Sequence, residues 1–245
     1  MLLVAWLAVP AASWLVRPSV GRLITEGAEL SKQSRWPEAL SVLDRAAAVA
    51  PRNAEAHFLK GVVLQRLGRA AEAAEELEAA VLLDARRPDA YLLLARLYEK
   101  AGRYDQALAN ALEAVRLDPS RAAGYRALGL AYFGQGRYEK AIEAYEKAKS
   151  SPAESGWVHN NLGYAYLLIG DLRSARRELE RAVAVAPDNA VARNNLGVAY
   201  ERLGMLREAR REYLMAVRID PGYANPRANL DNLARARPRR ARAGQ

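Results

Sequence analysis

A period of 34 residues constrains the fold of this chain more than any other feature. Small residues recur at this spacing six times, and two alanine series and one series of large side chains recur in step with them. Such self-similarity is typical of an architecture in which each repeat stacks on the next. The small residues are Gly27, Gly61, Ala95, Gly129, Gly163 and Gly197, and the first alanine series is Ala39, Ala73, Ala107, Ala141, Ala175 and Ala209.

Each repeat has the pattern of two helices joined by a tight turn. Apolar residues are spaced three and four apart rather than two, which predicts helices and no strands. A glycine in mid-repeat is expected to end the first helix, and a proline is expected to end the second. Small residues permit the close approach of two helices. The turn glycines are Gly68, Gly102, Gly136, Gly170 and Gly204, and the prolines are Pro51, Pro119, Pro187 and Pro221.

The spacing and the residue types resemble the tetratricopeptide repeat. The resemblance is carried by AYLLLARLYEKAGRYDQALANALEAVRLDP (90–119), NNLGYAYLLIGDLRSARRELERAVAVAP (160–187) and NNLGVAYERLGMLREARREYLMAVRIDP (194–221). It implies an all-α fold, a right-handed α-solenoid (superhelix) of about six helix-turn-helix hairpins with a C-terminal capping helix. The expected repeats span 20–53, 54–87, 88–121, 122–155, 156–189 and 190–223.

The C-terminal end departs from the repeat. Residues 224–236 are expected to form a single capping helix, because Leu230 continues the leucine series but no second helix follows. Residues 237–245 are expected to be a disordered basic tail. Such a tail contacts anionic lipid or nucleic acid, or it serves only as a solubilising terminus.

The N-terminal segment, residues 1–19, opens with sixteen residues that carry no charged side chain. Three interpretations stay open. The segment is a membrane anchor with Trp6 and Trp14 near the interfaces, a signal peptide, or a helix packed on the first repeat. The run is short for a span of roughly 20 residues, and no Lys or Arg precedes it. We expect membrane association through this segment, with the repeats either cytoplasmic or periplasmic.

Composition restricts the chemistry. The chain has no cysteine, which excludes disulfides, thiolate metal sites and a cysteine nucleophile. Its net charge is +9, but the five arginines from Arg235 onward leave only +4 for the rest. The abundance of Ala and Arg favours helices and is typical of a GC-rich bacterial genome.

No catalytic, cofactor or metal site is expected, and the chain is predicted not to be an enzyme. His57 and His159 occupy the slot that holds Tyr91 and Tyr125 in other repeats, so they are expected to be partly buried structural residues. The glutamates of the second helices are expected to lie on solvated faces, where they pair with Arg and Lys at a spacing of four.

Asparagines recur in the first helices of the last repeats, where packing does not require them. Asn161, Asn195 and Asn229 are 34 residues apart and each directly precedes a leucine, while Asn160 and Asn194 precede the first two. Asparagine is a mediocre helix former, so this accumulation indicates a functional role. An amide side chain can pair with both the N–H and the C=O of an extended peptide.

In the resembled family, first helices line a concave groove, and asparagine-lined grooves are found in members such as O-linked N-acetylglucosamine transferase. The resemblance implies a peptide-binding groove, with apolar contacts from three further side chains. Its residues are Asn160, Asn161, Asn194, Asn195, Asn229, Trp157, Tyr164 and Val198.

The predicted function is a protein–protein interaction scaffold that binds a peptide segment or a partner protein. No small-molecule substrate is expected, and nucleic acid is not a favoured ligand because the basic charge is concentrated in the tail. Two alternatives stay open: a structural assembly factor of the bacterial envelope, similar to pilotin proteins, or the non-catalytic arm of a larger enzyme complex.

Overall fold

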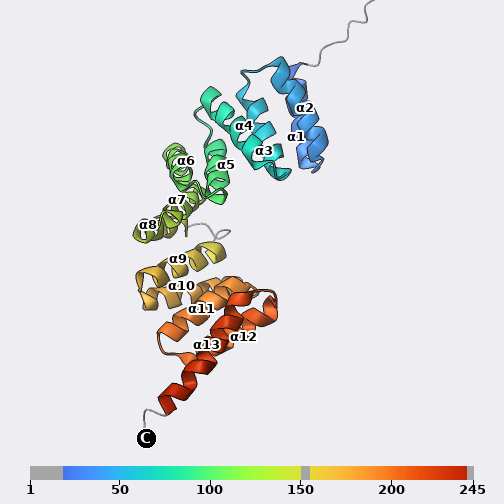
Figure 1. Cartoon of the computed structure of the whole chain (residues 1–245). Helices are drawn as coiled ribbons and strands as arrows, with labels where there is room; N and C mark the ends of the chain where they lie inside the picture. The colour runs from blue at the N-terminus through green and yellow to red at the C-terminus, as the bar shows by residue number, and fades with distance from the viewer. Residues whose placement is uncertain (1–18, 150–154, 242–245) are drawn as a thin grey trace, which may run out of the picture. The chain divides into compact units, whose positions relative to one another are not determined.

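The computed structural model describes residues 19–149 and 155–241, which form thirteen helices and no strand (Figure 1). Backbone contacts divide the chain into two units, and the division falls between Leu83 and Asp84. Unit 1 contains α1 (Val20–Lys32), α2 (Trp36–Val49), α3 (Ala54–Arg66) and α4 (Ala70–Leu83). Unit 2 contains α5 (Pro88–Lys100), α6 (Tyr104–Leu117), α7 (Ala122–Gly134), α8 (Tyr138–Ala148), α9 (Ser155–Ile169), α10 (Leu172–Val185), α11 (Ala190–Arg202), α12 (Leu206–Ile219) and α13 (Ala224–Ala241).

The helices pair as antiparallel hairpins, as the repeat pattern predicts. Each odd-numbered helix up to α11 packs on the even-numbered helix that follows it. In unit 2 each second helix also packs on the next first helix, so the hairpins stack in sequence order. The all-helical solenoid expected from the sequence is therefore confirmed.

A left-handed residue ends each of five first helices. The turn glycines have φ between 71° and 85°. At Gly102, this geometry lets the N–H of Arg103 donate to the carbonyl of Tyr98 at 2.8 Å, which satisfies an orphan carbonyl at the helix end. The glycine is needed because a β-carbon is unfavourable at positive φ.

The first repeat makes the same turn with a different residue. Ser34 lies 34 positions before Gly68 and has φ of 60°, the only positive φ at a non-glycine among the described residues. Its neighbour Arg35 donates its N–H to the carbonyl of Leu30 at 3.0 Å, as the glycine turns do. The fold thus imposes the left-handed conformation on a residue that disfavours it.

We expect Ser34→Gly to stabilise unit 1 by about 0.5–1 kcal/mol, because glycine relieves the left-handed strain. The reciprocal change, Gly102→Ser, should destabilise unit 2, since nothing lies within 4 Å of the new β-carbon and only backbone strain is added. Urea unfolding followed by circular dichroism measures both. An unchanged or lowered midpoint for Ser34→Gly would show that the turn is not strained.

Close contact at the small-residue series holds each hairpin together. A β-carbon at Gly163 would lie 2.4 Å from Leu179 Cγ, so the leucine packs directly on the glycine backbone. At Gly129 the partner is the ring of Tyr145. In the hairpin where the small residue is Ala95, the position sixteen residues later is Ala111 rather than a large side chain. A large side chain is thus present only where the facing residue is glycine.

The end of unit 2 differs from the expectation in one respect. Helix α13 packs on α12 and contributes Leu233, which is 6% exposed, so it covers the last hairpin. The sequence pattern predicts that the capping helix ends at residue 236 and that 237–245 are a disordered tail. In the structure, α13 continues to Ala241. Arg and Ala are strong helix formers, and Pro238 does not end the helix in this stretch. Residues 242–245 lie outside the described part of the chain.

The predicted N-terminal segment also lies outside the described residues, apart from Ser19, which caps α1. Among the helices of residues 19–149 and 155–241, none is long and apolar enough to cross a membrane.

Candidate functional site

Unit 2 contains a pocket of about 710 Å³. Most of its lining comes from the first helices α7, α9, α11 and α13, with single residues from α5, α6 and α8. One part of the lining is aromatic and aliphatic, and the other consists largely of asparagine side chains. The lining includes Glu99, Tyr104, Leu130, Phe133, Tyr145, Asn160, Asn161, Tyr164, Val191, Asn194, Asn195, Val198, Tyr223, Asn225 and Asn229.

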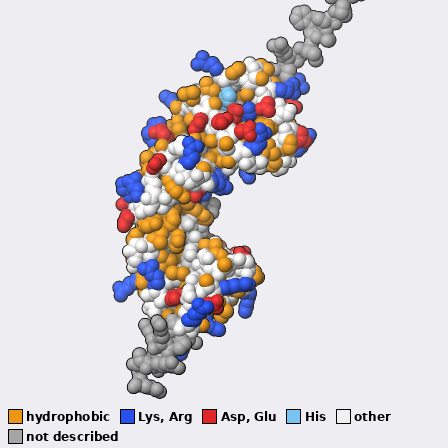
Figure 2. Space-filling model, viewed as in Figure 1, with side chains coloured by type: hydrophobic (Ala, Val, Ile, Leu, Met, Phe, Trp, Pro, Cys, Tyr) orange, Lys and Arg blue, Asp and Glu red, His pale blue; other side chains and the backbone are white. Residues whose placement is uncertain are grey.

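The aromatic part of the pocket is built around Phe133. Its ring centroid lies 5.6 Å from that of Tyr164 and 5.3 Å from that of Tyr138. Tyr164 is exposed, so this part offers an apolar surface to solvent. Figure 2 shows hydrophobic side chains gathered in this region of unit 2, beside α7 and α9. Such a surface suits an apolar side chain of a ligand.

The asparagine part is organised by hydrogen bonds between helices. Asn195 on α11 donates through Nδ2 to Oδ1 of Asn160 on α9 at 3.1 Å. Asn229 on α13 donates in the same way to Asn194 on α11 at 3.0 Å. These bonds join residues 35 apart, so each links a member of one asparagine series to a member of the other. Asn194 and Asn195 are buried, at 5% and 8% exposure.

The interhelical pairs change the interpretation of the asparagine ladder. The sequence predicts amide groups that are free to face a ligand. In the structure, four of the five asparagines form hydrogen bonds with one another, and these bonds join neighbouring first helices. A buried amide needs such partners, and the pairs fix the side-chain orientations. Part of the hydrogen-bonding capacity is therefore structural.

Two buried polar atoms on the pocket wall have no hydrogen-bond partner among the described residues. One is Nδ2 of Asn161 and the other is the hydroxyl of Tyr145. Burial raises the pKa of Tyr145, and the negative charge of Glu99 raises it further, so the hydroxyl remains a donor at neutral pH. Unsatisfied buried polar groups are costly, so each of these atoms is a donor that lacks an acceptor within the described residues.

The structure brings together seven of the eight residues predicted for the site. Trp157 is the exception, since it is not among the residues that line the pocket. Its ring makes an edge contact with Tyr145, with centroids 5.9 Å apart, and lies 5.5 Å from the guanidinium carbon of Arg126. Trp157 is 38% exposed and contacts the pocket lining through Tyr145.

Apart from Tyr164, sequence reasoning missed the aromatic part of the site. Tyr104, Phe133 and Tyr145 come from three helices of two hairpins, so no spacing within one helix unites them. A signal for Tyr145 was present, because it follows the small Gly129 by sixteen residues, as Leu179 follows Gly163. A large side chain in that slot must fill the space beside the glycine.

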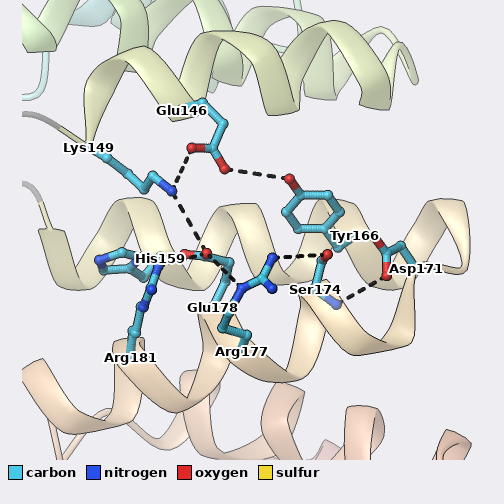
Figure 3. Close-up of polar contacts among 9 residues, drawn as sticks. All are labelled: Glu146, Lys149, His159, Tyr166, Asp171, Ser174, Arg177, Glu178 and Arg181. Atoms are coloured by element: carbon cyan, nitrogen blue, oxygen red, sulfur yellow. Dashed lines mark hydrogen bonds and ion pairs between the residues drawn. The ribbon is translucent and has the colours of Figure 1, made fainter.

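A buried carboxylate lies outside the pocket, between α9 and α10 (Figure 3). Glu178 is 2% exposed, and its Oε2 lies 2.7 Å from Nδ1 of His159. Its Oε1 lies 3.0 Å from Nη1 of Arg181, with Lys149 and Arg177 each 3.8 Å away. This arrangement neutralises the charge of a group that would otherwise be costly to bury.

The same pairing recurs at a separation of nineteen residues. His57 contacts Glu76 at 2.6 Å, and Arg193 contacts Glu212 at 2.8 Å. Where the first-helix slot holds Tyr91 or Tyr125 instead, the second-helix slot holds a neutral residue, Asn110 or Ala144.

The prediction that these glutamates lie on solvated faces is therefore wrong for Glu178 and Glu212, which are 2% and 6% exposed. A histidine or arginine side chain in the first helix allows the carboxylate to be buried. His57 and His159 are partly buried residues engaged in these pairs. No group of three or more His, Asp or Glu side chains in the described part of the chain is arranged to hold a metal ion.

Comparison with known families decides what these hairpins are. A tetratricopeptide repeat profile matches residues 92–155 and 160–224, which is more than half of the chain, and a second one matches residues 28–98. The chain belongs to the tetratricopeptide repeat family. Repeats of this family support a role as a protein–protein interaction scaffold, and such proteins are generally not catalytic.

Solved structures share the tetratricopeptide fold. A structure of Pseudomonas aeruginosa PilF is 20% identical with a TM-score of 0.74, and the match covers 87% of this chain and 97% of that one. A thermophilic tetratricopeptide protein of Thermus thermophilus is 27% identical with a TM-score of 0.57, over 74% and 99% of the two chains.

A structure of the Cut9–Hcn1 tetramer of the APC/C gives a TM-score of 0.72 at 16% identity. This chain is 87% covered by that match and spans 42% of the matched chain. No curated protein sequence gives a significant match. These likenesses establish the fold.

The carboxylate of Glu76 gives a pH-dependent prediction for unit 1. Burial by itself would raise its pKa, but hydrogen bonds from Lys60 and His57 outweigh this effect and lower it below 4.5. A pKa that is lower in the folded chain than in the unfolded chain stabilises the fold above pH 4.5, and this stabilisation is lost as pH falls through the folded value.

We expect Glu76→Gln to lower the stability of unit 1 near neutral pH, with the difference from wild type shrinking as pH falls below 4.5. Urea unfolding between pH 7 and pH 3 measures it. Glu75→Gln is the control, because Glu75 is exposed on the same helix and enters no ion pair within the described residues. An equal and pH-independent loss in both variants would contradict the prediction.

Proposed function

We propose that the chain is a non-catalytic scaffold that holds an extended segment of a partner protein in the pocket of unit 2. The carrying observation is that two unsatisfied donors, Asn161 Nδ2 and the Tyr145 hydroxyl, line the same pocket as the paired asparagines. An extended peptide supplies carbonyl acceptors at regular intervals along its backbone. It is the ligand class that best matches donors on neighbouring helices, here α8 and α9.

The hydrogen bonds between asparagines favour this function because they prepare the site in advance. Asn160 uses its acceptor oxygen toward Asn195, and its own amide N–H groups have no partner among the described residues. Asn229 donates to Asn194, and its own oxygen stays available. One end of the ladder thus offers donors and the other an acceptor, both held in fixed orientations. Preorganised groups lose less entropy when a ligand binds.

The aromatic part of the pocket supports a segment that carries an apolar side chain. Phe133 and Tyr164 form one wall, and Tyr104 and Leu130 lie in the same lining. Backbone recognition by amides is indifferent to sequence, so an apolar anchor would supply the selectivity. Aromatic residues frequently act as such anchor sites in protein interfaces.

Substitution of Asn161 tests the proposal. Peptides selected from a random displayed library for binding to the full chain would be measured against variants by fluorescence anisotropy. We expect Asn161→Ala to weaken binding about five- to tenfold, as for one lost hydrogen bond. Tyr145→Phe should weaken binding as well, while leaving the fold as stable as before or more so, because it removes an unsatisfied hydroxyl.

Asn232→Ala is the matched control, since Asn232 is exposed on α13 and does not line the pocket. Circular dichroism verifies that all variants are folded. If the selected peptides bind Asn161→Ala and Tyr145→Phe as tightly as wild type, the pocket is not the peptide site. If only substitutions in unit 1 weaken the binding of these peptides, the binding site lies in unit 1 instead.

A further inference from the structure

The second helices of the hairpins differ sharply in charge along the chain. Helix α4 in unit 1 carries four glutamates and no basic residue. Helices α10 and α12 in unit 2 each carry four arginines and two glutamates, for a net charge of +2 each. Because all second helices share one sequence pattern, this difference does not follow from the repeat itself.

The glutamates of these two helices do little to offset the arginines at the surface. Glu178 and Glu212 are buried, and they are paired with His159 and Arg193 of the preceding first helices. The other two glutamates are more accessible, since Glu180 is exposed and Glu208 is half-buried. The Oε1 atom of Glu180 lies 3.5 Å from Nε of Arg176. The solvent-facing side of α10 and α12 is therefore dominated by positive charge.

Several of these arginines have no partner to hold them. We define the basic face as Arg173, Arg177 and Arg181 of α10 with Arg207, Arg210 and Arg218 of α12, all of which are exposed. Arg177 and Arg181 reach the edge of the buried Glu178. The side chains of Arg173, Arg207, Arg210 and Arg218 form no ion pair or hydrogen bond within the described residues.

One position of the basic face repeats between the two helices. Arg173 and Arg207 are 34 residues apart, so they occupy the same position in successive hairpins. Equivalent positions in stacked repeats lie on the same side of the stack. In α12, Arg210, Leu214 and Arg218 follow at spacings of four, which places them along one side of the helix.

Exposed aliphatic side chains accompany the arginines. Leu214 is 43% exposed between Arg210 and Arg218, and Val185 is 55% exposed four residues after Arg181. The described part of this surface has no exposed aromatic side chain, since Tyr213 of α12 is fully buried. Proteins that bind single-stranded nucleic acid rely on aromatic stacking, so this composition does not favour nucleic acid.

We propose that the basic face of unit 2 docks on an anionic lipid bilayer. Arginine binds phosphate through paired N–H donors, and exposed aliphatic side chains can enter the headgroup region. The chain also carries sixteen uncharged residues at its start, outside the described part, which can supply a second, apolar contact. One weak signal gives only marginal membrane binding, whereas an apolar segment and a basic surface together give stable attachment. The inference does not depend on the peptide pocket.

Vesicle binding by the full chain tests this inference. Wild type is compared with the variant Arg173→Gln, Arg207→Gln, Arg210→Gln and Arg218→Gln, which removes four charges that form no ion pair within the described residues. Co-sedimentation uses vesicles of neutral phosphatidylcholine alone and of phosphatidylcholine with about one third phosphatidylserine. The variant Arg22→Gln, Arg45→Gln, Arg52→Gln and Arg86→Gln is the matched control, because these four residues are also exposed and lie elsewhere on the chain.

We expect wild type and the control to bind the anionic vesicles at least about tenfold more tightly than the basic-face variant does, with less difference at high salt. Binding to neutral vesicles, which reports the apolar segment, should be equal in all three. Equal weakening in both variants would mean that net charge and not the basic face is responsible. A duplex or single-stranded oligonucleotide that binds wild type more tightly than the vesicles do, and loses binding in the basic-face variant, would overturn the lipid assignment.

Discussion

The structure depends on how closely the two helices of each hairpin approach at the small-residue position. At Gly163, the side chain of Leu179 occupies the space where a β-carbon would lie, so the leucine packs on bare backbone. This contact sets the distance between the helices. The second helix then presents a defined surface to the next hairpin, and three of the four hairpins of unit 2 use the same contact, at Gly129, Gly163 and Gly197.

The buried glutamate and the paired asparagines of the stack are tolerated because each has a partner on a neighbouring helix. The carboxylate of Glu178 is buried against His159 and Arg181, and the amide of Asn195 pairs with Asn160. The first contact lies within a hairpin and the second lies between hairpins. A buried hydrogen bond has strict geometric requirements. These pairs therefore favour one alignment of the helices, which apolar packing alone defines less sharply.

The two surfaces that we connect with binding lie on different sets of helices. First helices supply most of the pocket, where paired amides and an aromatic wall surround two unsatisfied donors. Second helices supply the basic face, whose arginines are exposed because the acidic residues beside them are turned inward. One hairpin can thus serve two partners of different chemistry, since the side chains of its two helices contribute to separate surfaces.

The sequence alone determined the repeat length, the helix pairs and the turns. These follow from local spacing and from glycines such as Gly102, which mark a left-handed turn. It also indicated that the asparagines lie together. Only the tertiary structure decided how they pair, because Asn195 and Asn160 are on different hairpins, and their bond depends on the rotation of one first helix against the next. The same holds for the aromatic wall, where Tyr145 reaches the pocket past Gly129. Contacts between repeats depend on packing geometry that no periodicity in the chain records.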